Sequence, residues 1–225
     1  MLKIEDKLIV ALDVDTLDKA EYLVDLLYPE IRLFKVGSQL FTACGPSIVD
    51  FIREKGAEVF LDLKFFDIPN TVANAVRQAA RLKVRMLTLH ILGGEDMLKA
   101  AVKAAKEESG RLKIKPPLLI GVTVLTSQAT KPAQVVALAR AGISAGLDGV
   151  VSSVKEAALL RKSIHKGFII VSPGIRPPGA SLGDQKRVAT AQEAINAGSD
   201  FLVVGRPILE AKDPLRAVKE IIGSL

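Results

Sequence analysis

Short apolar runs recur along the chain, and each is followed by a polar turn and then by a stretch with helical periodicity. Runs that are apolar without strict alternation are typical of parallel strands covered on both faces. Eight such runs predict strands at residues 8–12, 31–36, 59–63, 86–90, 118–124, 149–152, 168–171 and 201–204. The intervening stretches carry apolar residues on one helical face and predict helices at residues 17–27, 46–55, 71–82, 95–108, 132–145, 154–163, 190–197 and 214–222.

Strict alternation of strands and helices favours a parallel sheet with right-handed crossovers. Eight units can close into a (β/α)8 barrel, and an open doubly wound sheet is the alternative. We favour the barrel because no Gly-x-Gly-x-x-Gly turn follows the first strand and because polar residues stand at the carboxyl ends of most strands. The sequence therefore predicts an α/β fold, a TIM barrel formed by a single domain over residues 1–225. Asp15 or Thr16 can cap the first helix, and Asp213 the last.

Composition narrows the classes of partner. The 225-residue chain carries a formal net charge of +6, which suits nucleic acid, an anionic membrane or a phosphorylated small molecule. Its Lys and Arg residues are scattered among Asp and Glu, and its few aromatic residues do not alternate with them, so a nucleic-acid-binding module is only a remote alternative. The first apolar run is too short for a membrane span or a signal peptide. Cys44 is the single cysteine, which favours a reducing compartment, and we expect a cytoplasmic protein with no membrane partner.

Three ionisable side chains, Asp62, Lys64 and Asp67, stand close together where the third apolar run ends. The alternation of a strand places Asp62 and Lys64 on the same face, and Asp67 lies beyond the strand, just before Pro69. Charges at the end of an apolar strand are costly unless they are paired. Together with Lys35, at the end of the second run, these residues can form one network of alternating charge near the barrel axis. A salt-bridge cluster with a purely structural role is the alternative.

Two further strand-end residues are less decisive. Asp13 either caps the first helix or belongs to the same site. His90 ends the fourth run, and we expect it to line the wall of the site rather than to act as a base or a ligand. The three nearby aspartates can supply oxygen ligands to a metal ion, but the two lysines compete for them, so we expect no metal.

A candidate phosphate site lies towards the end of the chain. The segment 173–185 is long and rich in Gly and Pro, and it contains Arg176 and Gln185. Gly205 and Arg206 follow the last predicted strand. Barrels of this kind often bind phosphate with the loops after strands seven and eight, so Arg206 can make a bidentate contact while Gly205 lets the backbone approach. We expect a phosphorylated substrate under a mobile lid, and a surface loop without function is the alternative.

Seven motifs resemble the orotidine 5′-monophosphate decarboxylase family along almost the whole chain. They are Ala11-Leu12-Asp13, Phe34-Lys35-Val36-Gly37, Asp62-Leu63-Lys64-Phe65-Phe66-Asp67-Ile68-Pro69-Asn70-Thr71, Val124-Leu125-Thr126-Ser127, Pro173-Gly174-Ile175-Arg176, Asp184-Gln185 and Val204-Gly205-Arg206. The Asp-x-Lys-x-x-Asp signature followed by Ile-Pro-Asn-Thr is the most specific of them. Many bacterial members have His in place of Phe66, which is not one of the charged residues.

The resemblance implies decarboxylation of orotidine 5′-monophosphate to UMP and CO2, the last step of de novo pyrimidine nucleotide synthesis, without metal or cofactor. Lys64 would protonate C6 of the pyrimidine, and Asp62 would lie beside the departing carboxylate. Lys35 and Asp67 would complete the catalytic network. The resemblance also implies a homodimer with shared active sites, in which Asp67 and its neighbours reach into the partner's site.

The resemblance extends to the residues that would hold the nucleotide substrate. Asp13 and Lys35 would bind the ribose hydroxyls, Thr126 and Ser127 the sugar or the pyrimidine, and the residues of the lid and the last strand the phosphate. The full substrate-binding set is Asp13, Lys35, Asp62, Leu63, Lys64, Phe65, Phe66, Asp67, Ile68, Pro69, Asn70, Thr71, Thr126, Ser127, Arg176, Gln185, Gly205 and Arg206.

A second enzyme class shares part of this pattern. Sugar-phosphate lyases and decarboxylases of the same barrel group, of the hexulose-phosphate synthase type, are similar in the Asp-x-Lys-x-x-Asp region but use Mg²⁺. Lys35 argues against this alternative, because an ammonium group at the end of the second strand would repel the metal ion.

Overall fold

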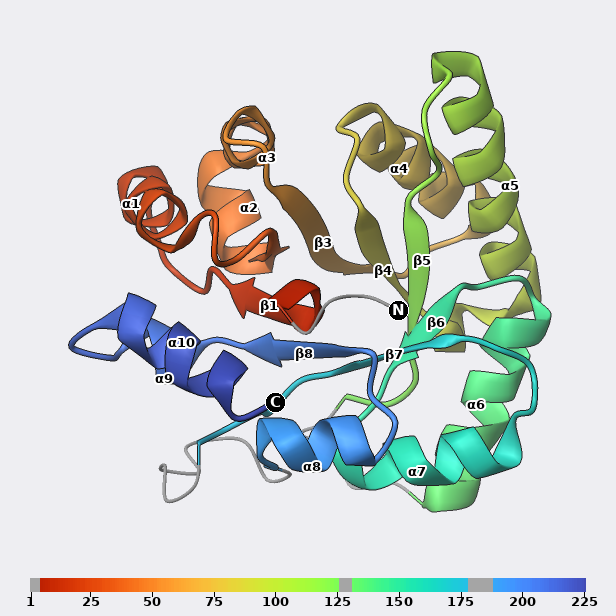
Figure 1. Ribbon diagram of the computed structural model, residues 1–225. Helices are drawn as coiled ribbons and strands as arrows, with labels where there is room; N and C mark the ends of the chain where they lie inside the picture. Colours follow the sequence, from red (N-terminus) through yellow and green to blue (C-terminus); the bar gives the residue numbers. More distant parts are fainter. Residues whose placement is uncertain (1–4, 126–130, 178–187) are drawn as a thin grey trace.

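The computed structural model describes residues 5–125, 131–177 and 188–225. Its strands form a closed barrel in which each strand pairs in parallel with the next and the last pairs with the first (Figure 1). The strands are β1 (Leu8–Ala11), β2 (Leu33–Gly37), β3 (Glu58–Phe65), β4 (Met86–His90), β5 (Leu118–Val122), β6 (Gly149–Val151), β7 (Ile169–Ser172) and β8 (Phe201–Val204). The predicted barrel is confirmed, and the open doubly wound sheet is excluded.

Helices surround the barrel, as Figure 1 shows. They are α1 (Leu17–Leu27), α2 (Ser38–Cys44), α3 (Ser47–Glu54), α4 (Pro69–Arg81), α5 (Gly94–Leu112), α6 (Pro132–Ser144), α7 (Val154–Ser163), α8 (Ala191–Asn196), α9 (Arg206–Leu209) and α10 (Pro214–Gly223), with 3-10 turns η1 (Glu5–Lys7) and η2 (Ile91–Gly93). Strict alternation is wrong at α2 and α9. Each of these short helices buries one side chain, Leu40 and Ile208, and so has no apolar stripe that periodicity can detect.

Helix ends follow the expected capping chemistry. The Thr16 side chain accepts a hydrogen bond from the Lys19 N–H at the start of α1. Asp213 does the same for Arg216 at the start of α10, where a proline occupies the first turn. The predicted caps of these two helices are confirmed. No helix in the described part of the chain is long and apolar enough to cross a membrane.

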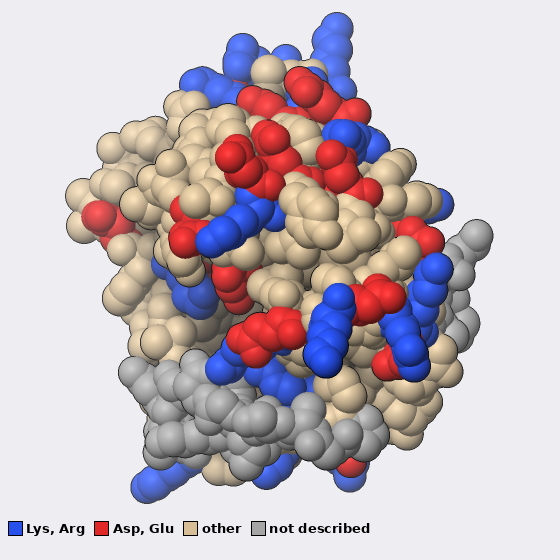
Figure 2. All heavy atoms as spheres, turned by 90° about the vertical axis from the view of Figure 1, so that its left-hand side faces the viewer, with Lys and Arg blue, Asp and Glu red and all other residues tan. Residues whose placement is uncertain are grey.

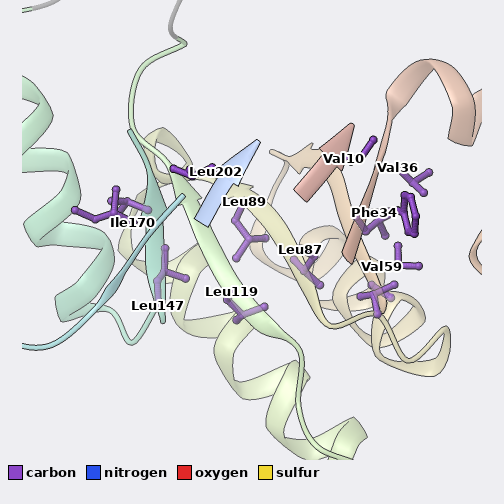
Figure 3. Close-up of a cluster of buried hydrophobic side chains, with 14 of the residues drawn as sticks. Val10, Phe34, Val36, Val59, Leu87, Leu89, Leu119, Leu147, Ile170 and Leu202 are labelled. Atoms are coloured by element: carbon purple, nitrogen blue, oxygen red, sulfur yellow. The ribbon is translucent and has the colours of Figure 1, made fainter. Parts of the chain in front are cut away.

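Apolar side chains form two layers, one inside the barrel and one between the barrel and the helices. On β1, Ile9 and Ala11 join the inner cluster, whereas Leu8 and Val10 join the outer one. Figure 3 shows part of the outer layer, including Val10, Phe34, Leu87, Leu89 and Leu202. The inner cluster consists of Ile9, Ala11, Leu33, Phe60, Met86, Ile120, Val171, Phe201 and Val203. Continuing the alternation beyond these residues places the inward side chains of β1 to β4 at the carboxyl end of the barrel.

Candidate active site

One cavity opens where the carboxyl ends of the strands meet, with a volume of about 240 Å³. Its apolar wall comes from the barrel and its polar wall from residues on β2, β3 and the loops after β1, β7 and β8. The lining residues are Ala11, Asp13, Lys35, Phe60, Asp62, Lys64, Val122, Val124, Leu125, Val151, Val171, Pro173, Gly174, Arg176, Val203, Gly205 and Arg206. Seven of the residues in the predicted site therefore line a single cavity: Asp13, Lys35, Asp62, Lys64, Arg176, Gly205 and Arg206.

Asp62 is the centre of a chain of ion pairs. Lys64 Nζ lies 2.9 Å from Asp62 Oδ1, and Lys35 Nζ lies 3.6 Å from Asp62 Oδ2. Lys35 Nζ also donates to Asp13 Oδ1 at 3.0 Å. The side chains of Lys35 and Asp62 are only 12% and 14% exposed. Two ammonium groups and two carboxylates thus alternate in sequence Asp13, Lys35, Asp62, Lys64.

The position of Asp62 keeps its carboxyl group ionised. Burial alone would raise the pKa of Asp62, but the charges of Lys35 and Lys64, with hydrogen bonds from Lys64 and Thr88, outweigh it and hold this pKa below its usual value. Removing one partner of a buried ion pair typically costs about 3–5 kcal/mol, so the second lysine matters for tolerating this charge. The site therefore carries a fixed negative charge between two positive ones.

The strand β3 is irregular where it carries these charges. Its ladder with β4 passes from Leu61 opposite Leu87 to Phe65 opposite Leu89, so β3 advances four residues while β4 advances two. Lys64 has a φ of 50°, in the left-handed region that non-glycine residues rarely adopt. The prediction that Asp62 and Lys64 point the same way is confirmed by their contact. The extra residues of β3 were not predicted, because periodicity does not reveal a bulge.

Asp67 does not belong to the charged network of its own barrel. It lies on the turn after β3, is exposed, and its Oδ1 accepts a hydrogen bond from the Ile68 N–H at 2.6 Å. Among the described residues no ion pair of Asp67 is found. Within one chain the second carboxylate of the network is therefore Asp13, and a network that Asp67 completes in a partner subunit stays a prediction.

The rest of the signature segment divides by orientation. Leu63 and Phe65 pack against the outer apolar layer. Phe66 to Thr71 are all exposed, and Pro69, Asn70 and Thr71 form the first turn of α4. Neither group lines the cavity in a single chain. Their contribution to substrate binding stays a prediction.

His90 lies close enough to Lys64 to feel its charge, but it is not among the residues that line the cavity, so its expected place in the wall is not confirmed. Its ring stacks on Phe66 with centroids 5.3 Å apart. Burial and then the charge of Lys64 lower the pKa of His90. Within the described part of the chain, its Nδ1 is buried without a hydrogen-bond partner. A ring that packs on Phe66 and lies outside the cavity lining does not suit a base that reaches the substrate.

The candidate phosphate residues lie on the opposite wall of the cavity from β3. Arg176 is 8% exposed, and its guanidinium donates to the Ile175 carbonyl at 3.0 Å. Arg206 is the first residue of α9, directly after Gly205. A methyl group on Gly205 would lie 3.4 Å from Asp13 Oδ2, at the limit of an ordinary van der Waals contact. Thr126, Ser127 and Gln185 lie outside the described residues.

Two residues of this site were given no role by the sequence analysis. A methyl group on Gly37 would lie 3.1 Å from Lys35 Nζ, so the ammonium would have to shift by a few tenths of an ångström. Thr88 is fully buried and bonds to both Asp62 and Lys64. The sequence does contain one sign of its importance, since Thr88 is a polar residue within an apolar run, two positions before His90.

Charge elsewhere on the molecule is mixed. Figure 2 shows acidic and basic side chains interspersed on the face that lies at the left of Figure 1. Many of the cations are paired along their own helix, such as Lys19 with Asp15 and Arg216 with Glu220. The excess of positive charge is therefore not gathered on this face.

The fold and the charged cavity at the carboxyl ends of the strands are those of a (β/α)8-barrel enzyme. A family model described as Orotidine 5'-phosphate decarboxylase / HUMPS family matches residues 6–221. A protein from Syntrophotalea carbinolica named orotidine 5'-phosphate decarboxylase is 48% identical over 233 residues, which cover 99% of this chain and 96% of the relative. One of the same name from Moorella thermoacetica is 46% identical, over 98% of this chain and 92% of the relative.

A solved structure of the same name is also similar to this chain. The crystal structure of orotidine 5'-phosphate decarboxylase from Lactobacillus acidophilus superposes with a TM-score of 0.84 at 34% identity, and the match covers 96% of this chain and 97% of that one. The chain belongs to the orotidine 5′-phosphate decarboxylase family. The family and the enzyme class predicted from the sequence motifs are thereby confirmed.

Proposed function

We propose that this chain decarboxylates orotidine 5′-monophosphate to UMP and CO2 in pyrimidine nucleotide synthesis, with no metal or organic cofactor. The observation that carries the proposal is the buried Asp62 carboxylate held between Lys35 and Lys64 in a cavity that Arg176 and Arg206 also line. The names of the relatives give the substrate. The cavity supplies the two chemical features that such a substrate needs, a cation at the reacting carbon and cations for a phosphate.

Lys64 is the residue that completes the reaction. When the bond between C6 and the carboxylate carbon breaks, CO2 leaves and the electron pair remains on C6. The Lys64 ammonium stabilises this developing charge and then donates a proton to C6, giving UMP. Its contact with Asp62 at 2.9 Å fixes the direction of the ammonium before the substrate arrives.

The other charged residues orient the substrate. Asp62 lies beside the departing carboxylate, where the two negative charges oppose one another in the bound state and part when CO2 leaves. Lys35 and Asp13, joined at 3.0 Å, bind the ribose hydroxyls as a donor and an acceptor. Thr126 and Ser127 contribute contacts to the sugar or the pyrimidine.

Phosphate binding falls to the loops after β7 and β8. Arg176, Gln185, Gly205 and Arg206 hold the phosphate, with Arg206 as the bidentate ligand. The phosphate is remote from C6, so its binding energy organises the closed site and acts on turnover as well as on affinity.

The active unit of this proposal is a homodimer in the cytoplasm. Phe66, Ile68 and Leu92 are 59%, 67% and 54% exposed, a concentration of apolar surface beside the exposed Asp67. A partner subunit that covers this surface would receive Asp67, Ile68 and Thr71 near its own site. The single cysteine supports a reducing compartment.

A Mg²⁺-dependent sugar-phosphate enzyme is the second candidate, since the family description also includes the HUMPS group. A metal ion at the carboxyl ends of β1 to β3 would need Asp13 and Asp62 as ligands. Lys35 bridges these two carboxylates, and a cation at its position excludes a second cation on electrostatic grounds. The names of the relatives also favour the nucleotide decarboxylase.

An assay in the presence of EDTA tests the proposal directly. The purified protein is incubated with excess EDTA, and the absorbance loss of orotidine 5′-monophosphate is followed. We expect the same rate with and without the chelator, because charge stabilisation comes from lysines. Loss of turnover in EDTA, or turnover of a hexulose phosphate but not of the nucleotide, would reject the proposal.

The variant Arg206→Ala should lose phosphate recognition. We expect UMP to bind roughly tenfold to a hundredfold more weakly, the usual effect of losing hydrogen bonds to a charged group, while uridine binds as to the wild type. Isothermal titration with both ligands measures the difference. Arg216→Ala, an exposed arginine on α10 paired with Glu220, is the matched control and should change neither affinity. Equal weakening for UMP and uridine would show that Arg206 is not a phosphate ligand.

A further inference from the structure

We propose that Thr88 is a positioning residue that holds the Asp62 carboxylate and the Lys64 backbone in their reactive arrangement. The arrangement itself is a property of the structure, and its effect on turnover rests on the proposed function. The inference starts from a buried polar side chain that the mechanism above does not use.

The location of Thr88 is unusual for a hydroxyl group. Its neighbours Leu87 and Leu89 both point outward into the apolar layer seen in Figure 3. Thr88 therefore faces the barrel interior, one step above Met86 of the inner cluster, and it is 0% exposed. A hydroxyl group placed there without hydrogen bonds would cost stability, so its partners explain why it is present.

Both partners belong to the charged stretch of β3. The Thr88 hydroxyl donates to Asp62 Oδ1 at 2.9 Å, and its oxygen accepts a hydrogen bond from the Lys64 backbone N–H at 2.8 Å. Because a hydroxyl group has one proton, donation to Asp62 and acceptance from Lys64 can occur together. Lys64 Nζ donates to the same carboxylate oxygen at 2.9 Å. The three hydrogen bonds thus form a closed ring, which runs from Thr88 to the Asp62 carboxylate, on to the Lys64 ammonium, and back through the Lys64 backbone N–H to Thr88.

This ring explains the irregular backbone of β3. Between Leu61 and Phe65 the ladder with β4 is out of register, and the residue of β4 that faces this gap is Thr88. Lys64 adopts a φ of 50°, which costs about 1–2 kcal/mol for a residue with a Cβ. Such strain persists only where the surroundings determine it, and the hydrogen bond from Lys64 N–H to Thr88 is the contact that does so.

The pKa of Asp62 depends on Thr88 and on the neighbouring charged groups. The groups that face it are Lys35 from β2 and Lys64 from β3, with Asp13 behind Lys35 and His90 beside Lys64. Of the contacts that lower the pKa of Asp62, the hydrogen bond from Thr88 is the only one from β4. A variant without the hydroxyl removes this hydrogen bond without removing either lysine, and it should therefore raise the pKa of Asp62.

Three variants separate positioning from packing. Thr88→Val keeps the shape but removes the hydroxyl, and Thr88→Ser keeps the hydroxyl but removes a methyl group. Thr123→Val is the matched control, since Thr123 is also buried at a strand end but bonds only weakly to the Val151 carbonyl, at 3.4 Å. We expect Thr88→Val to lower kcat roughly tenfold to a hundredfold with little change in KM. Thr88→Ser and Thr123→Val should stay within about threefold of the wild type.

A readout independent of turnover completes the test. The Asp62 carboxyl group is titrated by carbon-13 NMR in all four proteins, and hydrogen exchange is measured at the Lys64 amide. Thr88→Val should raise the pKa of Asp62 and accelerate Lys64 exchange at least about tenfold, while the serine variant and Thr123→Val match the wild type. If Thr88→Val does not fold, fast exchange of the Lys64 amide in wild-type protein is the contradicting result.

The two proposals can fail separately. Identical Asp62 titrations and Lys64 exchange in the wild type and Thr88→Val would overturn the role of Thr88, whatever the enzyme does. A wild-type protein that does not decarboxylate the nucleotide would overturn the proposed function, while the titrations would still decide the arrangement of Asp62 and Lys64.

Discussion

Replacement of Lys64 by alanine is expected to abolish decarboxylation of orotidine 5′-monophosphate, with a loss of roughly 10⁴-fold or more in kcat. The variant removes both the cation that stabilises charge on C6 and the proton that C6 receives. The protein should remain folded, because Asp62 keeps Lys35 as an ionic partner and Thr88 as a hydrogen-bond donor.

Single-turnover kinetics and a thermal melt together check this result. Lys19→Ala is the matched control, since Lys19 also pairs with an aspartate, Asp15, but both side chains are exposed on α1 and its N-terminal turn. We expect wild-type kcat for the control. A folded Lys64→Ala protein that keeps more than about a tenth of wild-type kcat would rule out Lys64 as the proton donor.

Mixing two inactive variants should restore activity if the site is shared between subunits. Lys64→Ala and Asp67→Ala are each expected to lose at least about a hundredfold in kcat. After subunit exchange half of the dimers are mixed, and one of the two sites in a mixed dimer has both residues intact, so the mixture should recover about a quarter of wild-type activity. The observation behind this expectation is that Asp67 is exposed and outside the ion pairs of its own barrel.

The control for this experiment uses two residues of the same barrel. Lys64→Ala mixed with Asp62→Ala should show no recovery, because their 2.9 Å contact lies within one chain and no mixed site has both residues. Native mass spectrometry of isotope-labelled subunits verifies exchange in both mixtures. Exchange without recovery for Lys64→Ala with Asp67→Ala would assign Asp67 to its own barrel or to no site.

The sequence predicts those parts of the structure that follow from a repeated pattern of apolar and polar residues. Strand bounds deviate by at most two residues at either end, because each strand is marked by a short run of mainly apolar residues. The strand-end positions of Asp13, Lys35, Asp62 and Arg206 follow from the same pattern. The cost of burying charge then predicts that Lys35 and Asp62 pair, as they do at 3.6 Å.

What the sequence does not reveal depends on single contacts between elements distant along the chain. The left-handed conformation of Lys64 has no local signal, since Leu63 and Phe65 on either side favour a regular strand. Asp13, and not Asp67, pairs with Lys35 in the same chain, because Asp67 lies on the exposed turn after β3. The alternation of a strand does not predict the direction that a turn takes after the strand ends. The importance of Gly37 appears only when the Lys35 ammonium is seen above it.

The bulge in β3 has a consequence for how such a protein can change over evolution. Asp62 and Lys64 lie on a strand whose register is fixed by Leu61 below and Phe65 above, so an insertion or deletion there would displace both charges at once. Arg176 and Arg206 instead follow strands and stand next to connections that tolerate changes of length. On the proposed function, changes in the connections after β7 and β8 can alter substrate preference without displacing Asp62 or Lys64. The matching family model carries two names, Orotidine 5'-phosphate decarboxylase and HUMPS, and this separation of substrate recognition from the charged strand is one physical route by which such a family can diversify.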